Sequence, residues 1–220
     1  MKSSTPKGPT RAGRPIDQDK QKHILQVAHR LLLQGGVHAV NMEAVARLAG
    51  VSKATVYARY ASRDALIRAA VHAQSGEFIA PFERPPVQAH DLRAALLRFA
   101  TEILWFLSRP ETHAFLRVMG EAPEPLLGLR DGIFQSGPQS TLEGLAQWLR
   151  AAALTGLIDC PHPQRSAEAL LGMLMGMDLI RGAFGQPIQC DHSELATRVQ
   201  FVIDLFLRAH KSAKSPEKLF

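Results

Sequence analysis

Cysteines and aromatic residues are scarce in this chain. Only 2 of the 220 residues are cysteine and 6% are aromatic. Two thiols cannot build the dense disulfide framework of a small secreted domain. Cys160 and Cys190 could meet as a redox pair, but we expect two separate thiols in a reducing compartment. His162 beside Cys160 gives two metal ligands without companions, so we expect no metal site.

Long hydrophobic runs and strand-like alternation are also missing. Charged residues interrupt every apolar stretch before it reaches the ~20 residues that a transmembrane helix needs, and residues 1–6 lack the apolar core of a signal peptide. We therefore expect a cytoplasmic protein. Hydrophobic residues make up 46% of the chain and recur at helical spacing, which predicts an all-α fold.

The sequence contains no catalytic constellation. Its nine histidines are scattered, and no His-x-x-x-His, Cys-x-x-Cys, nucleophile elbow or phosphate-binding glycine loop occurs. We expect no enzymatic activity and no cofactor, and an enzyme of helical-bundle type is the most distant alternative.

Residues 41–66 have the pattern of a helix-turn-helix. Met42 and Val45 recur on one helical face, and Gly50 then ends that helix. Ser52 is the expected N-cap of a second short helix, from Lys53 to Tyr60. An earlier helix begins at Asp17, ends near Gln34-Gly35-Gly36 and packs its apolar stripe against the other two.

Positive charge is concentrated in the same part of the chain. Residues 1–70 contain 12 basic and 4 acidic side chains, a balance of +8, whereas residues 71–207 contain 10 basic and 15 acidic, a balance of −5. Because each cation near a phosphate releases condensed counterions, this distribution favours double-stranded DNA as the partner. A merely solvated basic surface is the alternative.

One run of residues has a joint spacing that is far more specific than any single member: Ala44-Val45-Ala46, Ala49-Gly50-Val51-Ser52-Lys53-Ala54-Thr55-Val56-Tyr57, then Tyr60, Ser62, Arg63 and Leu66. Over residues 17–70 the chain resembles the DNA-binding domain of the TetR family of transcriptional regulators. Family members most often have glycine at Ala54, phenylalanine at Tyr60 and lysine at Arg63, and these departures affect which bases are read.

The second short helix is expected to enter a major groove, with Lys53, Ala54 and Tyr57 nearest the bases. The phenols of Tyr57 and Tyr60 can donate to phosphate, as the matching aromatics commonly do in TetR-like domains. In the flexible run Gly13-Arg14-Pro15, the arginine can reach a minor groove, or the run is a solvated tail. The predicted DNA contacts are Arg14, Asn41, Arg47, Ser52, Lys53, Ala54, Thr55, Tyr57, Tyr60 and Arg63.

We divide the chain into four parts from composition and helix-breaking residues. Residues 1–15 form a flexible basic arm, 16–75 the DNA-binding domain, 76–210 a helical regulatory and dimerisation domain, and 211–220 a basic tail.

The last two expected helices, 166–184 and 193–209, have more apolar surface than one bundle would cover, which predicts a homodimer reading two half-sites. The resemblance implies the same pairing, as a four-helix bundle. Core helices of a monomer are the alternative. The predicted interface residues are Ala169, Met173, Gly176, Ile180, Leu195, Val199, Val202 and Phe206.

A weaker likeness to the AcrR-like branch of the family, over 116–121 and 156–158, implies a ligand pocket inside the bundle. Large and adaptable side chains of the right kind are present, although such sets more often form ordinary core. Arg117 and Glu121 could anchor a ligand or form a surface pair. The predicted pocket residues are Phe99, Trp105, Phe106, Phe115, Arg117, Met119, Trp148, Met173 and Met177.

Together these patterns predict a homodimeric repressor that a small, largely apolar ligand releases from a palindromic operator. The ligand would shift the fourth helix, residues 62–78, and change the separation of the two DNA-binding heads. A constitutive DNA-binding dimer and a transcriptional activator remain as alternatives.

Overall fold

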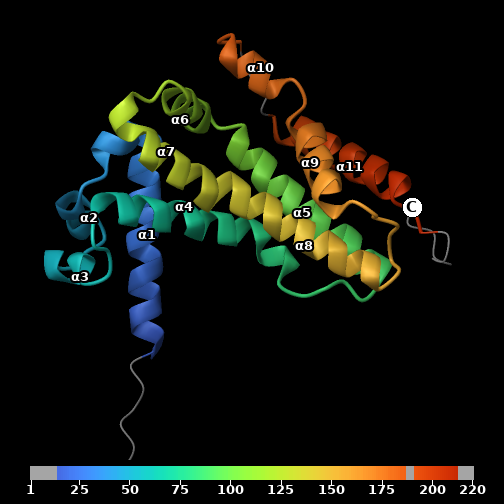
Figure 1. Cartoon of the computed structure of the whole chain (residues 1–220), viewed down its shortest axis with the longest axis horizontal. Helices are drawn as coiled ribbons and strands as arrows, with labels where there is room; N and C mark the ends of the chain where they lie inside the picture. Colours follow the sequence, from blue (N-terminus) through green and yellow to red (C-terminus); the bar gives the residue numbers. More distant parts are fainter. Residues whose placement is uncertain (1–13, 187–190, 213–220) are drawn as a thin grey trace, which may run out of the picture.

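The computed structural model describes residues 14–186 and 191–212, and helices dominate both ranges (Figure 1). Within them no β-strand forms, and an isolated antiparallel bridge joins Ile158 to Lys211. The predicted all-α fold is confirmed. None of the described helices is long and apolar enough to cross a lipid bilayer.

The first four helices form a head and a connection to the rest of the molecule. Their bounds are α1 (Arg14–Ala39), α2 (Met42–Leu48), α3 (Lys53–Tyr57) and α4 (Arg63–Ile79). Helix α2 lies beside α1 and α3 packs against α2, and α4 leaves the head and runs along α8 (Ser140–Leu154) (Figure 1). One helix therefore belongs to both the head and the bundle.

Short polar residues begin three of these helices, and one of them, Ser52, is the predicted cap. Asn41, Ser52 and Ser62 are the N-caps of α2, α3 and α4, and each side chain accepts a hydrogen bond from a backbone amide three residues on. Gly50, at φ +65°, has the left-handed conformation that the tight turn between α2 and α3 requires. Helix α3 ends at Tyr57 and not at Tyr60, because the chain must turn to reach Ser62.

The remaining helices form the bundle and its connections. Their bounds are η1 (Ala80–Phe82), α5 (Ala89–Leu107), α6 (Pro110–Gly120), η2 (Glu124–Leu126), α7 (Leu127–Phe134), η3 (Gln135–Gln139), α9 (Pro163–Met175), α10 (Asp178–Ala183) and α11 (His192–Ala209). Helices α5, α8, α9 and α11 enclose the bundle core, in which Phe99, Leu149 and Phe206 are almost fully buried.

The expected single helix over 166–184 is wrong. Gly176, at φ +50°, ends α9, and α10 then projects away from the bundle (Figure 1). A glycine in this conformation cannot continue an α-helix, so the chain changes direction there.

The core of the head is completed by residues from later in the chain. Phe115 and Met119 of α6, together with Leu129 and Ile133 of α7, pack with buried residues of α1, α2 and α4. The head therefore shares its hydrophobic core with α6 and α7.

A polar contact joins α4 to the π-helical turn η3. The buried hydroxyl of Ser75 donates to the carbonyl oxygen of Gly137 at 2.7 Å and lies 2.7 Å from the hydroxyl of Thr141. Thr141 belongs to α8. If α4 moves, either these hydrogen bonds break or η3 and the start of α8 move with it.

Cys160 is buried as a free thiol, and burial raises its pKa. Cys190, most of the expected basic arm and most of the basic tail lie outside the described residues. No group of three or more potential metal ligands occurs within the described ranges.

Candidate nucleic-acid interface

Helix α3 presents one side to the core and the other to solvent. Val56 is fully buried, whereas Lys53 and Ala54 are exposed and Tyr57 is 51% exposed. Thr55 is partly buried. A five-residue helix is too short to be stable alone, so the anchoring of Val56 fixes how the exposed side chains are presented.

Hydrogen bonds at the helix starts orient the surroundings of α3. The Ser52 hydroxyl accepts from the Thr55 amide at 3.1 Å and lies 2.8 Å from the Thr55 hydroxyl. The Asn41 side-chain oxygen accepts from the Ala44 amide at 2.7 Å. Both predicted contact residues therefore hold exposed helix N-termini, whose partial positive charge favours an anion such as phosphate.

Several cations near α3 already have partners. Lys53 Nζ lies 3.4 Å from Glu43 Oε1, and Arg63 Nε lies 3.2 Å from its neighbour Asp64. A backbone hydrogen bond, followed by the charge of Lys53, lowers the pKa of Glu43. These ion pairs are solvent-exposed and therefore weak, so a phosphate can compete for the lysine or the arginine.

Tyr60 is not part of the exposed surface. The residue is 8% exposed and belongs to the core of the head, and its hydroxyl is shielded from solvent. The expectation that its phenol donates to phosphate does not hold in this conformation, because no phosphate oxygen could reach it. The side chain of Arg14 lies outside the described residues.

The last helix buries the stripe that was predicted to form a dimer interface. Leu195, Val199, Val202 and Phe206 face the bundle's own core, so their assignment to an interface was wrong. The opposite side of α11 exposes Phe201, at 62%, and Leu205, at 41%.

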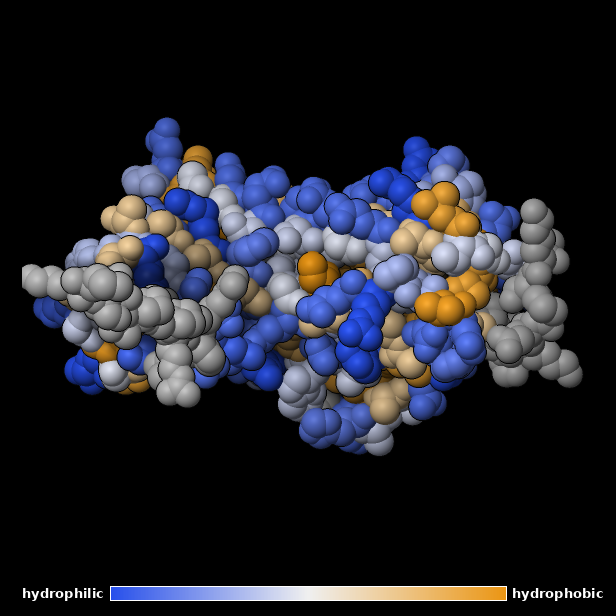
Figure 2. All heavy atoms as spheres, turned by 90° about the horizontal axis from the view of Figure 1, so that it is seen from below, coloured by the Kyte–Doolittle hydropathy of each residue, from blue (hydrophilic) through white to orange (hydrophobic). Residues whose placement is uncertain are grey.

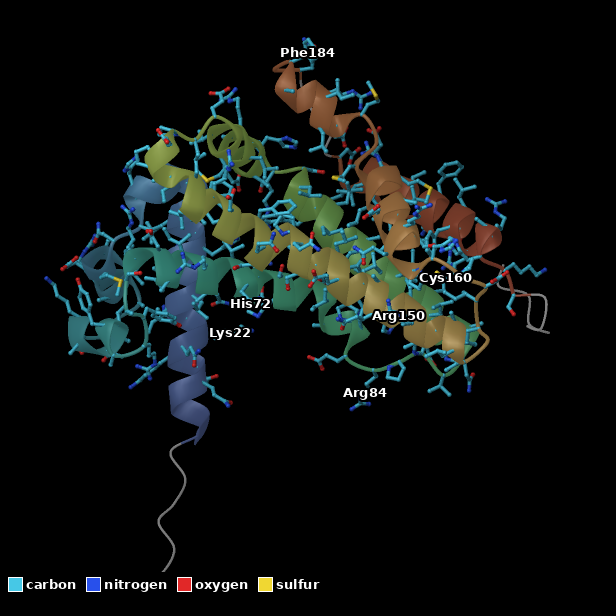
Figure 3. The ribbon with its side chains drawn as sticks, in the orientation of Figure 1. Lys22, His72, Arg84, Arg150, Cys160 and Phe184 are labelled. Carbon is cyan, nitrogen blue, oxygen red and sulfur yellow. The ribbon has the colours of Figure 1, made fainter. Side chains whose placement is uncertain are left out.

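On α9 and α10 the predicted residues are divided. Ala169, Gly176 and Ile180 are exposed, and Met173 is partly buried against the core. Phe184 lies at the end of α10 and points away from the bundle (Figure 3). Figure 2 shows the larger hydrophobic groups of the viewed face at the bundle end of the molecule, away from the head.

The residues predicted to line a ligand pocket do not enclose one common cavity. Phe99 is in the bundle core and Met119 in the core of the head. Phe106 and Met173 are half-buried against the bundle core, and Met177 is 55% exposed.

The other four residues lie on three separate hollows. Trp148 lines a hollow of about 470 Å³ beside η1, and Phe115 lines one of about 320 Å³ between α1 and α6. Trp105 and Arg117 line a third, of about 460 Å³, bounded by α5, α6 and α10.

Two family models match most of the chain. Residues 24–70 match bacterial regulatory proteins of the tetR family, and residues 94–212 match the C-terminal domain of AefR-like transcriptional repressors. The second match alone covers more than half of the 220 residues. The chain belongs to the TetR family.

Among curated proteins, this TetR-family chain is similar to the uncharacterized HTH-type transcriptional regulator YdeS of Bacillus subtilis. The two are 41% identical over 58 residues, which is 26% of this chain and 29% of YdeS. The likeness to YdeS is therefore limited to a minor part of both proteins.

Solved structures of TetR regulators share the fold over nearly their whole length. A TetR transcriptional regulator from Agrobacterium tumefaciens is 21% identical with a TM-score of 0.66, and the match covers 89% of this chain and 96% of that one. The flavonoid-responsive regulator FrrA is 26% identical with a TM-score of 0.60, and the match covers 90% of this chain and 100% of that one.

Sequence reasoning missed two groups of residues in this TetR-family protein. Phe201 and Leu205 are four residues apart, and that spacing placed them on one face of α11 from the start. Arg109 and His113 lie on the wall of the hollow between α5, α6 and α10. The chain brings α10 to this hollow through the turn at Gly176, and no local sequence pattern predicts that α10 lies beside α6.

Proposed function

We propose that this TetR-family regulator is a homodimeric repressor that a small ligand releases from a palindromic operator. The observation that carries the proposal is the exposed face of α3, where Lys53, Ala54 and Tyr57 surround the buried anchor Val56. This face fits a major groove, and a short basic helix needs a second copy to bind DNA tightly.

The DNA contacts fall into two classes. Lys53, Ala54 and Tyr57 lie nearest to base edges, and Thr55 reaches a base or a phosphate. The phenol of Tyr57 also donates a hydrogen bond to phosphate. Backbone contacts come from residues that flank α3 on either side and from the preceding arm: Asn41, Arg47, Ser52, Arg63 and Arg14. Tyr60 supports the head from within.

The dimer contact that we propose combines α9, α10 and α11. Phe201 and Leu205 are large apolar side chains on an exposed helix face, and Ala169 and Gly176 expose small residues that allow a close helix approach. Burying this surface against the same surface of a second copy gives a two-fold contact at the end of the molecule opposite the head.

Ligand release is supported by the way the bundle holds the head. Helix α6 packs Phe115 and Met119 into the core of the head while its other side lines a hollow. A ligand in that hollow can shift α6, and with it α1 and α4. FrrA, 26% identical, is described as flavonoid-responsive. A regulator of this kind acts in the cytoplasm.

Selection of bound duplexes from a random pool by the full chain tests the proposal, followed by fluorescence anisotropy on the selected DNA. We expect an inverted repeat bound by two copies. Tyr57→Phe should weaken binding by about 3- to 10-fold through a lost phosphate hydrogen bond. Tyr60→Phe is the matched control, because its hydroxyl is buried, and it should leave affinity unchanged.

Recovery of a single half-site, or of no duplex at low salt, would contradict the dimeric DNA-binding function. An operator complex that no small molecule dissociates would instead identify a constitutive DNA-binding dimer. Increased transcription from a promoter that carries the operator would identify an activator.

A further inference from the structure

The hollow between α5, α6 and α10 has an unusual set of charges on its wall. Arg109 and Arg117 both line it, and neither forms an ion pair with a carboxylate in the part of the chain that the structure describes. Glu121, the residue that follows α6, lies one turn from Arg117, yet no ion pair joins the two among the described residues. Two guanidinium groups on one wall leave positive charge for an anion to neutralise.

A buried polar atom also lies at this wall. His113 Nε2 is shielded from solvent and has no hydrogen-bond partner among the described residues. The imidazole is held against α10, since a Cβ atom built on Gly182 would lie 2.7 Å from His113 Nδ1. An unsatisfied buried nitrogen is costly. Because Nε2 is shielded in this conformation, the imidazole would have to shift toward the hollow before a ligand oxygen could satisfy it.

Apart from Ser108 and Gln186, the rest of the wall is apolar, and it includes a large ring. Trp105 is half-buried, and Arg109 lies over it with its guanidinium carbon 6.0 Å from the ring centroid. Ala114 adds a further apolar surface. The volume of about 460 Å³ is in the range of small-molecule sites. His192 already stacks on Trp105, with ring centroids 4.3 Å apart. A flat ligand ring could therefore pack against the part of Trp105 that lines the hollow while its charged group reaches the arginines.

From these contacts we infer that the hollow binds a small aromatic carboxylate, with Arg109 and Arg117 on the carboxylate, His113 on an oxygen of the ligand and Trp105 on its ring. This assignment rests on the proposed ligand response and deepens it, because it replaces a largely apolar ligand by an anionic one.

Calorimetric titration of the full-length protein, without DNA, tests the inference. The probes are benzoate, 1-naphthoate and indole-3-acetate, each paired with its neutral primary amide. At least one acid should bind about 10-fold or more tightly than its amide, since a bidentate arginine contact with a carboxylate is lost in the amide.

In the double variant Arg109→Gln with Arg117→Gln, the preference for the acid should fall to less than about 3-fold. Arg117→Gln alone, at an exposed position, keeps the test valid if the double variant does not fold, and should lower the preference severalfold. Arg150→Gln is the matched control, an exposed arginine on α8 (Figure 3), and should leave the preference unchanged.

Equal binding of every acid and its amide, or a preference that survives both arginine substitutions, overturns the assignment. A preference that depends on the arginines supports it, even if the acid fails to dissociate a protein–DNA complex. In that case the site stands and ligand release is wrong. DNA binding without any preference for acids would leave the regulator in place and remove only this inference.

Discussion

The buried carboxylate of Asp178 accepts hydrogen bonds from Arg198 and Arg181, and the first of these joins α10 to α11. Asp178 is 5% exposed, whereas its partners keep some contact with solvent. The bond to Arg198 joins two residues that are 20 positions apart in the chain. This bond ties α10 to α11, and α10 forms part of the wall of the proposed ligand site.

Asp178→Asn should destabilise the protein because it removes the charge that two arginines share. We expect a loss of about 2 kcal/mol in the free energy of unfolding, reduced from the cost of breaking a fully buried pair by the exposure of the arginines. Urea unfolding followed by circular dichroism measures it. Asp131→Asn, on a side chain that is 68% exposed, is the control and should have almost no effect.

His29 should give the protein a pH-dependent stability. Burial, and then the charge of Arg109, lowers the pKa of His29 from 6.5 to about 4. The unfolded chain therefore binds more protons between these values, so stability is lost as the pH falls from about 6.5 to about 4. The full contribution is on the order of 3 kcal/mol.

Unfolding of His29→Gln from pH 7.5 to 4.5, compared with the unchanged chain, isolates this contribution. The variant should lose less stability over the range, while His72→Gln, at an exposed position, should follow the unchanged chain. Identical slopes for all three proteins would show that His29 is not buried as a neutral ring. Arg109→Gln should raise the pKa of His29, and an NMR titration of the imidazole would detect the change.

Much of the head could be predicted from sequence because its signals are local. The caps at Asn41, Ser52 and Ser62 and the turn at Gly50 depend on residues within one turn of each other. The face of α11 could not be predicted in the same way. Both of its sides are apolar, and helical periodicity groups Val202 with Phe206 as readily as it groups Phe201 with Leu205.

The ligand site was only half predictable for a similar reason. Trp105 and Arg117 were chosen by residue type, and the structure places both on one hollow. Phe115 was chosen on the same grounds and instead packs in the head. Residue type alone does not say which side of α6 faces the head, because that choice is made by the packing of α1 and α7 against it.

Glu43 should weaken DNA binding, because its Oε1 pairs with Lys53 Nζ at 3.4 Å and its carboxylate adds negative charge beside α3. Glu43→Gln should tighten binding and make the dependence of log affinity on log salt steeper by about 1 per subunit. Lys53→Ala should make this salt dependence shallower by a similar amount. It should also reduce the preference for one base at one position of each half-site. Anisotropy titrations at several salt concentrations measure both slopes.

The control for that experiment is Glu143→Gln, an exposed glutamate on α8, which should leave the slope unchanged. If Glu43→Gln and Glu143→Gln bind DNA identically, Glu43 does not weaken DNA binding.

Phe201→Glu should separate the proposed dimer, because two copies would place carboxylates against each other in an apolar contact. We expect a monomer in analytical ultracentrifugation and a loss of operator affinity of about 100-fold or more, since one head alone contacts one half-site. Phe134→Glu is matched in residue type and, at 52% exposed on α7, similar in exposure. It should remain dimeric, and a dimeric Phe201→Glu would move the interface elsewhere.

The placement of Phe115, Met119, Leu129 and Ile133 in the core of the head has a practical consequence for building chimeric regulators. A hybrid spliced just after α4 would bring a foreign α6 and α7 against α1, leaving gaps or clashes where these four side chains fit. A chimera that joins this DNA-binding head to another ligand-binding domain should therefore keep α6 and α7 of this chain together with its first four helices.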